Sequence, residues 1–197
     1  MTSDLTNICV FAGSGVGRSP RYREAAESLG AELAERGIGL VYGASGIGLM
    51  GATADAALTA GGKVVGVIPE ALLALEQVHT GLSELHVVDS MHARKAKMAS
   101  LVDAFVALPG GMGTLEELLE IATWSKLGIH AKPCGVVNVD GYYDPLDSML
   151  GHAVAENFIR PEDRDLVLFH TDPKLLLDRL DEWISPRNPT TGKQLGT

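Results

Sequence analysis

The 197-residue sequence predicts an α/β protein whose single domain is built on a doubly wound parallel sheet. Short β-branched runs alternate with longer segments of helical periodicity along the whole chain. The short runs are continuously apolar, which is typical of parallel strands buried on both faces. With 46% hydrophobic and 21% charged residues, the chain is also long and apolar enough for one sizeable core.

The expected elements follow one another in regular order. The runs that predict buried strands are NICVFAG (7–13), IGLVYG (38–43), KVVGVIP (63–69), ELHVVD (84–89), AFVALP (104–109), KPCGVVNV (132–139) and LVLFH (166–170). Segments with helical spacing lie between them, near residues 20–36, 47–60, 91–102, 114–128, 145–157 and 172–184. The expected domain spans residues 1–184. The Pro-, Thr- and Gly-rich residues 185–197 have little to bury and are expected to form a disordered tail.

Charge and hydropathy exclude several classes of partner. A net charge of −9 and a pI near 5.1 disfavour binding to a nucleic-acid polymer, which needs a basic face. No apolar run approaches the roughly 20 residues that span a membrane, and the N-terminus lacks the features of a signal peptide. Cys9 and Cys134 fall in expected buried strands, so we interpret them as core thiols rather than a disulfide. We therefore expect a cytoplasmic protein that binds neither membranes nor nucleic acid.

Three of the expected strands end in glycine-rich turns, AGSGVG (12–17), YGASGIGLMG (42–51) and PGGMGT (109–114). Ligands of a doubly wound sheet bind outside the carboxyl ends of its strands, and a helix start attracts anions through its free amides. Tight turns need glycine for backbone reasons alone, so one such turn would mean little. Three turns at one edge predict a ligand that carries phosphate. The candidate loop contacts are Gly13, Ser14, Gly43 and Gly46.

The second turn contains GIGLMG (46–51), which matches the dinucleotide-binding pattern G-x-G-x-x-G, with Glu70 about 20 residues further on. The match lies on the second strand–helix unit, and Glu70 follows Pro69 instead of ending a strand, so NAD binding is disfavoured. No Walker A pattern occurs in a suitable place. The six histidines lack metal-ligand spacing and no serine lies in G-x-S-x-G, so we expect neither a metal site nor a covalent serine mechanism.

The third turn leads into Thr114 and Glu117, which have two interpretations. Thr114-x-x-Glu117 matches a capping box, in which the threonine caps the helix and the glutamate reaches back to its amide. Alternatively, Glu117 is a functional carboxylate at the ligand-binding edge of the sheet. Glu116 and Glu120 are expected to be solvated charges at the start of the helix.

Arg94 favours the functional interpretation. In the segment 90–101, Met91 and Met98 belong to an apolar stripe, and Arg94 lies three residues after the first and four before the second. A guanidinium on such a core-facing stripe is unfavourable unless it meets an anion. That anion is either a structural salt-bridge partner or, at the same sheet edge, a ligand phosphate or the carboxylate of the third turn. Lys95 is expected to rotate away from the stripe.

These motifs resemble a known family, and the segments that carry the resemblance are PGGMGTLEE (109–117), MHARKAKM (91–98), VYGASGIGLMG (41–51) and GVIP (66–69). They are similar to the LOG family, the cytokinin riboside 5′-monophosphate phosphoribohydrolases that are often labelled lysine decarboxylases. The resemblance covers residues 7–184. The decarboxylase label is disfavoured, because no lysine lies in a recognisable setting for a pyridoxal phosphate Schiff base.

The resemblance implies a Rossmann-like homodimeric enzyme that needs no cofactor. It would hydrolyse the N-glycosidic bond of an adenine-type nucleoside 5′-monophosphate, either AMP or an N6-substituted cytokinin riboside monophosphate. The products would be the free base and ribose 5-phosphate. A non-catalytic nucleotide sensor or cofactor carrier of the same fold is the alternative from another functional class.

By this resemblance, the family's catalytic arginine corresponds to Arg94 and its catalytic glutamate to Glu117. The positions that contact nucleotide correspond to Glu76, Arg94, Lys95, Gly111, Met112, Gly113, Thr114, Leu115, Glu116, Glu117 and Thr123. In one departure, the family's second loop usually reads YGGG, whereas Ala44 and Ser45 interrupt it here. This difference bears on the fine shape of the ribose or base pocket.

The glycines and the carboxylate suit opposite ends of such a substrate. Amides of the glycine-rich turn and the helix start would bind the 5′-phosphate. Glu117 would face the ribose, where cleavage of the C1′–N9 bond builds positive charge. A carboxylate there stabilises that charge and can orient or deprotonate water. Arg94 would either position the phosphate or hold Glu117 ionised.

The helix expected over residues 114–128 is apolar on nearly every side. One sheet face cannot cover so many apolar side chains, and a partner helix is the simplest cover for the remainder. The sequence thus gives independent support to the homodimer that the resemblance implies.

Overall fold

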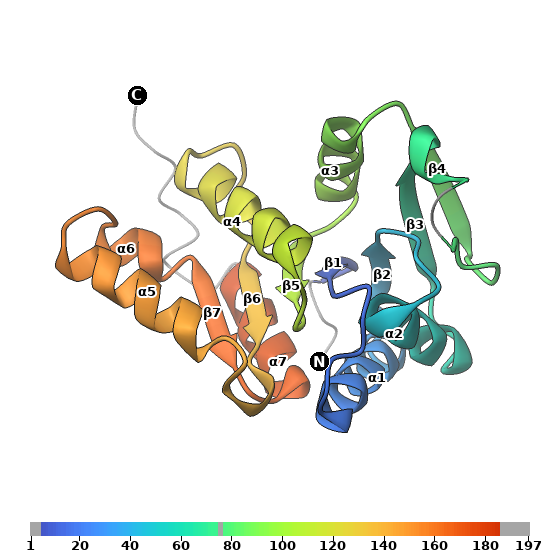
Figure 1. The fold of residues 1–197 in the computed structure, drawn as a ribbon, viewed down its shortest axis with the longest axis horizontal. Coiled ribbons are helices and arrows are strands. Elements are labelled where there is room, and N and C mark those ends of the chain that lie inside the picture. Colours follow the sequence, from blue (N-terminus) through green and yellow to red (C-terminus); the bar gives the residue numbers. More distant parts are fainter. Residues whose placement is uncertain (1–4, 75–76, 186–197) are drawn as a thin grey trace.

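The structure, a computed structural model, describes residues 5–74 and 77–185. Its centre is one parallel sheet of seven strands in the order β4-β3-β2-β1-β5-β6-β7 (Figure 1). The strands are β1 (Asn7–Phe11), β2 (Gly39–Tyr42), β3 (Val64–Pro69), β4 (Glu84–Val88), β5 (Ala104–Ala107), β6 (Cys134–Val137) and β7 (Val167–His170). The α-helices are α1 (Pro20–Glu35), α2 (Gly48–Thr59), α3 (Met91–Ser100), α4 (Met112–Lys126), α5 (Asp144–Ala155), α6 (Pro161–Arg164) and α7 (Pro173–Ile184). Within the described ranges no helix has both the length and the apolarity needed to cross a membrane.

The α/β class and the doubly wound parallel sheet are confirmed, as are all seven expected strands and six expected helices. Most element bounds differ by one or two residues, because the strands pass into glycine-rich turns before the apolar runs end. Helix α6 was not expected, since four residues are too few to show a helical period. Residues 1–4 of the expected domain and 186–197 of the expected tail lie outside the described residues.

Alternate strand residues face two separate apolar cores, one on each side of the sheet. Ile8 and Val10 belong to the core under α1, α2 and α7, whereas Cys9 and Phe11 belong to the core under α3, α4 and α5. Because side chains alternate along a strand and both faces are covered, nearly every position of the inner strands β1, β2, β3, β5 and β6 is apolar. Cys9 and Cys134 are free and buried, as the sequence predicted.

The sheet changes its direction of growth at β1, and this reversal positions the candidate site. From β1 the chain adds β2, β3 and β4 on one side, then returns through α3 to β5 on the other side of β1 (Figure 1). The loops that leave β1 and β5 therefore flank the topological switch point, where sheets of this kind bind ligands. There the amide of Gly13 donates to the carbonyl of Pro109 at 3.1 Å, which joins the first and third glycine-rich turns.

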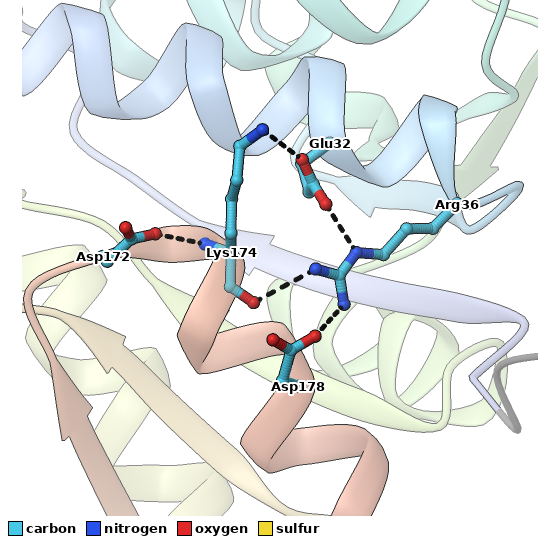
Figure 2. Close-up of polar contacts among 5 residues, drawn as sticks. All are labelled: Glu32, Arg36, Asp172, Lys174 and Asp178. Atoms are coloured by element: carbon cyan, nitrogen blue, oxygen red, sulfur yellow. Dashed lines mark hydrogen bonds and ion pairs between the residues drawn. The ribbon is translucent and has the colours of Figure 1, made fainter. Parts of the chain in front are cut away.

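A network of charged side chains joins α1 to α7 on the face of the sheet that α1, α2 and α7 cover (Figure 2). The carboxylate of Glu32 accepts from Arg36 Nε at 2.7 Å and from Lys174 Nζ at 2.9 Å. Arg36 also donates to Asp178 Oδ1 at 2.6 Å and to the carbonyl of Lys174 at 3.2 Å, while Asp172 accepts the amide of Lys174 and caps α7. Burial alone would raise the pKa of Glu32, but these hydrogen bonds outweigh it and the pKa is lowered. Each charge that this network buries has a partner.

Candidate functional site

The third glycine-rich turn leads directly into α4, and no side chain in the described ranges caps this helix start. Gly111 is the N-cap residue, with extended backbone (φ −88°, ψ −156°), and Met112 and Gly113 are the first helical residues. The first amides of a helix have no partner within the helix and lie at the positive end of its dipole. Gly111 and Met112 are exposed, so solvent and ligands can reach this end of α4. The turn thus has the geometry of an anion site.

The capping box that was one interpretation of Thr114 and Glu117 does not form. Because α4 begins at Met112, Thr114 is already the third helical residue, and its side chain is buried against Gly110 instead of capping the helix. Leu115 next to it is partly buried in the core under α3, α4 and α5. The helix start is therefore set by the backbone of the turn, and Glu117 is not needed for it.

The N-terminal ends of α1 and α2, which follow the other two glycine-rich turns, already bind groups of the protein itself. Ser19 caps α1 with its hydroxyl. The amide of Leu49, in the first turn of α2, donates to the carbonyl of Gly13 at 2.9 Å. Gly48 has a left-handed backbone (φ 65°), and a Cβ there would overlap the backbone of Ser14. The GIGLMG segment thus packs the second glycine-rich turn against the first, an arrangement that disfavours NAD binding there.

The turns that follow β1 and β5 approach so closely that only glycine fits between them. A Cβ on Gly13 would lie 3.2 Å from the Cα of Gly110. A Cβ on Gly110 would lie 2.9 Å from the nitrogen of Gly13 and would overlap the hydroxyl of Thr114. Gly13 is buried, whereas Ser14 beside it is exposed. The first turn is therefore fixed against the third, and Ser14 is the accessible side chain of the two candidate contacts.

Arg94 lies on α3 with only 7% of its surface exposed. Its Nη2 donates to the carbonyl of Gly43, at the end of β2, at 3.1 Å, and its Nη1 lies 3.8 Å from the sulfur of Met91. Its Nε has no hydrogen-bond partner, and the guanidinium forms no ion pair, within the part of the chain that the structure describes. A structural salt bridge, one interpretation of Arg94, is thus not seen there. A Cβ on Gly43 would overlap the guanidinium, so glycine is required at that position.

Lys95 is also buried, with 8% of its surface exposed, and it joins α3 to α4. Its Nζ lies 2.6 Å from Glu116 Oε1 and 2.8 Å from Glu120 Oε2. Burial lowers the pKa of this ammonium, but the two carboxylates outweigh burial and the pKa is raised. Lys95 was expected to rotate away and is buried instead; Glu116 is exposed as expected, but it and Glu120 both pair with Lys95. The pairing spans 21 sequence positions, which local periodicity cannot reveal.

Glu117 carries the most perturbed carboxyl group of the site. Burial raises its pKa from the ordinary 4.5 to about 7, and the positive charge of Arg94 offsets only part of that rise. No hydrogen bond or ion pair joins Glu117 to Arg94 among the described residues, so the two groups interact through space. Burial also raises the pKa of the Cys9 thiol, and the charges of both Glu117 and Arg94 act on it. The arginine and the glutamate therefore lie together over β1, at the switch point of the sheet.

The loop that departs from the family pattern contains a strained residue. Ala44 is fully buried and has a left-handed backbone (φ 66°), a conformation that glycine adopts far more easily than alanine. A YGGG loop places glycine at this position, which explains the pattern physically. Ser45 is buried, and the amide of Gly46 donates to the carbonyl of Gln77 at 2.7 Å. Gly43 thus leaves room for the guanidinium of Arg94, and the amide of Gly46 bonds to the neighbouring loop.

One candidate position, Thr123, is not brought together with Arg94 and Glu117. Thr123 lies six residues after Glu117, about 9 Å further along the axis of α4. Its hydroxyl donates to the carbonyl of Leu119 at 2.7 Å, and it lines a groove of about 190 Å³ between α4, α5 and α6. Glu76 lies outside the described residues.

The sequence reasoning missed two tyrosines, one of which contacts the third turn and the other the residue just before it. The hydroxyl of Tyr142 donates to the carbonyl of Gly110 at 2.5 Å, and that of Tyr143 donates to the carbonyl of Leu108 at 2.7 Å. A signal for them existed: the segment DGYY (140–143) directly follows an expected strand and so had to lie at the same sheet edge.

The two buried or partly buried lysines near the sheet, Lys95 and Lys132, do not fit Schiff-base chemistry at this edge. Lys95 is held as a cation by two carboxylates, whereas a Schiff base forms from a neutral amine. Burial lowers the pKa of Lys132, but its Nζ donates to the carbonyl of Ala99 at 2.6 Å, ahead of β6 and so at the opposite edge. Within residues 5–74 and 77–185, no group of three or more His, Cys, Asp and Glu side chains could hold a metal ion.

Comparison with known sequences identifies close relatives. The model of the family described as "Possible lysine decarboxylase" matches residues 50–180. The chain is 48% identical over 182 residues to "Cytokinin riboside 5'-monophosphate phosphoribohydrolase LOG" of Oryza sativa subsp. japonica, covering 92% of this chain and 75% of that protein. It is also 48% identical over 191 residues to the phosphoribohydrolase of the same description, LOG7, of Arabidopsis thaliana, covering 97% and 88% of the two chains.

Solved structures with this fold are more distant in sequence. The molybdenum cofactor binding protein of Rippkaea orientalis aligns with a TM-score of 0.68 at 22% identity, over 91% of this chain and 98% of that one. The molybdenum cofactor carrier protein of Chlamydomonas reinhardtii aligns with a TM-score of 0.66 at 19% identity, over 90% and 97%. At these identities the likeness shows the Rossmann-like fold alone.

Proposed function

This chain belongs to the LOG family of cytokinin riboside 5′-monophosphate phosphoribohydrolases, and from that premise we propose that it is itself such an N-glycosidase. It hydrolyses the N-glycosidic bond of an adenine-type nucleoside 5′-monophosphate and releases the free base and ribose 5-phosphate. One observation in the structure carries the proposal most directly. The buried Arg94, whose Nε has no partner among the described residues, shares one site with Glu117, whose carboxyl has a pKa of about 7.

The 5′-phosphate binds at the start of α4. The amides of the uncapped first turn and the dipole of the helix attract an anion there, and Arg94 supplies a buried positive charge. Arg94 Nε, which has no partner in the part of the chain that the structure describes, is a donor for the substrate, because a buried guanidinium without its full set of partners is otherwise unfavourable. The same charge lowers the pKa of Glu117 below the value that burial alone would give.

Glu117 acts on the ribose. Breaking the C1′–N9 bond leaves an oxocarbenium-like sugar, and an ionised carboxylate in a water-poor site stabilises that cation strongly. With a pKa of about 7, the same carboxylate can accept a proton from the attacking water at neutral pH. Substrate binding thus places the phosphate on the amides and the ribose on the carboxylate, so the two opposed charges of the site serve two ends of one molecule.

The non-catalytic alternative, a nucleotide sensor or cofactor carrier, has the support of the fold alone. A carrier needs the anion site but gains nothing from a desolvated carboxylate beside it. The joint placement of Arg94 and Glu117 therefore favours the enzyme.

The functional unit that we propose is a homodimer. Helix α4 leaves Leu119 (41%) and Leu127 (64%) exposed, and Met149 of α5 and Phe158 after it are 61% and 82% exposed. These side chains and the groove that includes Thr123 lie on the α4–α5 side, and a second copy is the simplest cover for such an apolar surface. Light scattering tests this: we expect a dimer at micromolar concentration, and a stable, active monomer would contradict it. We also propose a cytoplasmic location for this acidic protein.

The activity itself is tested by incubating the purified protein with AMP and with isopentenyladenosine monophosphate and measuring the free base by chromatography. We expect both monophosphates to be cleaved, because a hydrophobic pocket discriminates by only about 1–3 kcal/mol per small group. Stoichiometric release of ribose 5-phosphate identifies hydrolysis. Tight binding of either nucleotide without release of base would favour the carrier or sensor instead.

A further inference from the structure

The third glycine-rich turn is held from two sides. On the inner side, Gly13 donates to the carbonyl of Pro109 at 3.1 Å, and Gly110 packs against the same loop. On the outer side, the hydroxyl of Tyr142 donates to the carbonyl of Gly110 at 2.5 Å. The side chain that fixes this peptide comes from the loop between β6 and α5, which carries none of the glycine-rich motifs.

The bond from Tyr142 sets the direction of one specific amide. In a trans peptide the C=O of one residue and the N–H of the next point in opposite directions. The chain has no cis peptide bond in its described ranges, so fixing the carbonyl of Gly110 towards Tyr142 turns the N–H of Gly111 away from it. Gly111 is the N-cap residue of α4, where that N–H joins the free amides of the helix start. Because both residues are glycine, the peptide between them would otherwise rotate easily.

Tyr142 is itself firmly placed. Its ring packs edge-on against Tyr22 at 5.7 Å and against Tyr143 at 5.0 Å between ring centroids. The turn before it contains Asp140 in a left-handed conformation (φ 51°), unusual for a residue other than glycine. The carboxylate of Asp140 accepts from Arg21 Nη1 at 2.6 Å, which ties this turn to the start of α1. A backbone conformation of this kind persists only where its surroundings hold it.

The two adjacent tyrosines differ in exposure and in hydrogen-bond partner, so a structural role of one can be distinguished from a functional role of the other. Tyr143 is 1% exposed, and its hydroxyl donates to the carbonyl of Leu108 inside the core. Tyr142 is 39% exposed, so its hydroxyl does not serve core packing and its loss should affect folding little. The bond from Tyr142 is nevertheless short and made to the one turn that starts the anion site.

We propose that Tyr142 is a positioning residue that holds the Gly110–Gly111 peptide with its N–H directed at the substrate's 5′-phosphate. This rests on the proposed function, since it assigns Tyr142 to the phosphate end of that site. Tyr142 does not touch the reacting atoms. It acts through the peptide, so its removal weakens phosphate binding and leaves the chemical step nearly unchanged.

The test compares Tyr142→Phe with Tyr22→Phe, which removes a hydroxyl that has no hydrogen-bond partner among the described residues while keeping the same aromatic packing. For Tyr142→Phe we expect KM for AMP to rise about tenfold with kcat within about twofold of wild type, the size of one lost orienting hydrogen bond. Inhibition by ribose 5-phosphate should weaken by the same factor, whereas inhibition by adenine, which lacks phosphate, should not change. Tyr22→Phe should match wild type in all three, and Tyr143→Phe should lower the melting temperature without changing the ratio of the two inhibition constants.

Two results would overturn the assignment of Tyr142. One is an unchanged affinity of Tyr142→Phe for ribose 5-phosphate, and the other is an equal loss for ribose 5-phosphate and adenine. Calorimetric titration with ribose 5-phosphate separates this proposal from the proposed function. If wild type binds ribose 5-phosphate but cleaves no nucleotide, the phosphoribohydrolase fails while Tyr142 is still tested by binding. If wild type does not bind it at all, there is no phosphate site to position and the proposal falls.

Discussion

Two carboxylates of this protein, Glu32 on α1 and Glu117 on α4, each lie near an arginine and yet ionise in opposite ways. Glu32 is bonded directly by Arg36 and Lys174, and its pKa is lowered in spite of burial (Figure 2). Across residues 5–74 and 77–185 Glu117 has no such bond, and burial raises its pKa to about 7 although Arg94 acts on it through space. The α1–α7 network pairs its charges within the protein, whereas Arg94 Nε on α3 has no hydrogen-bond partner among the described residues. An incomplete network of this kind indicates function more strongly than a complete one.

The largest effect that this contrast predicts is on catalysis. Glu117→Gln should lower kcat/KM for AMP by about 10³-fold or more, because glutamine neither stabilises a cation nor accepts a proton from water. Glu32→Gln should stay within about twofold of wild type, since its network lies on the other face of the sheet. Steady-state release of adenine measures both variants. Retention of most activity by Glu117→Gln would remove the catalytic assignment.

The next largest effect concerns Arg94. Arg94→Ala should lower kcat/KM for AMP by about 10²-fold, the loss of a charge-assisted contact to phosphate. Lys97 on the same helix is the matched control, because it is partly exposed and forms no ion pair within the described residues, so Lys97→Ala should remain close to wild type. If Arg94→Ala folded poorly while its soluble fraction kept full specific activity, the arginine would be structural and the contrast with Arg36 would disappear.

The smallest effect is on stability, and here the two carboxylates should differ in sign. The folded pKa of Glu117 is raised, so the folded state holds its proton more tightly than the unfolded state, and stability falls as pH rises from about 4.5 to 7. Above pH 7 the carboxylate destabilises the fold by up to about 3 kcal/mol, which Glu117→Gln should recover. The pKa of Glu32 is lowered, so its contribution is present at pH 7 and is lost as pH falls through its folded pKa. Glu32→Gln should therefore destabilise by about 1 kcal/mol at pH 7 and by less in acid.

Denaturant melts at pH 5 and pH 8 measure both free energies of unfolding. We expect Glu117→Gln to be more stable than wild type at pH 8, with the difference shrinking at pH 5. A Glu117→Gln variant that is destabilised equally at both pH values would mean that this glutamate is a structural residue like Glu32.

The sequence predicted those features that depend on local spacing. Arg94, set three residues after Met91 and four before Met98, was expected on the core-facing side and is 7% exposed. The third turn was expected at the ligand-binding edge, and it lies at the switch point. Both inferences need only the helical period and the rule that parallel strands end at one edge.

The features that the sequence did not predict depend on tertiary contacts or on the backbone of a single turn. The Thr-x-x-Glu spacing fits a threonine at the N-cap and equally a threonine inside the first helical turn. In the structure the N-cap residue of α4 is Gly111 and not Thr114. The pairing of Lys95 with Glu116 crosses between helices, and the bond from Tyr142 to Gly110 crosses between loops 32 positions apart. No periodicity within one element could reveal either contact.

In the proposed function, one end of the site binds the 5′-phosphate while the other end acts on the ribose. The most direct measurement is kcat/KM of the wild-type protein for AMP and for adenosine, which differ only in that phosphate. Removing the phosphate leaves the amides of α4 and Arg94 without their partner, and each unpaired donor costs about 1–3 kcal/mol. We predict that adenosine is cleaved at least about 10²- to 10³-fold less efficiently than AMP. Comparable values of kcat/KM for the two would contradict the assignment of the third turn and of Arg94 to the phosphate.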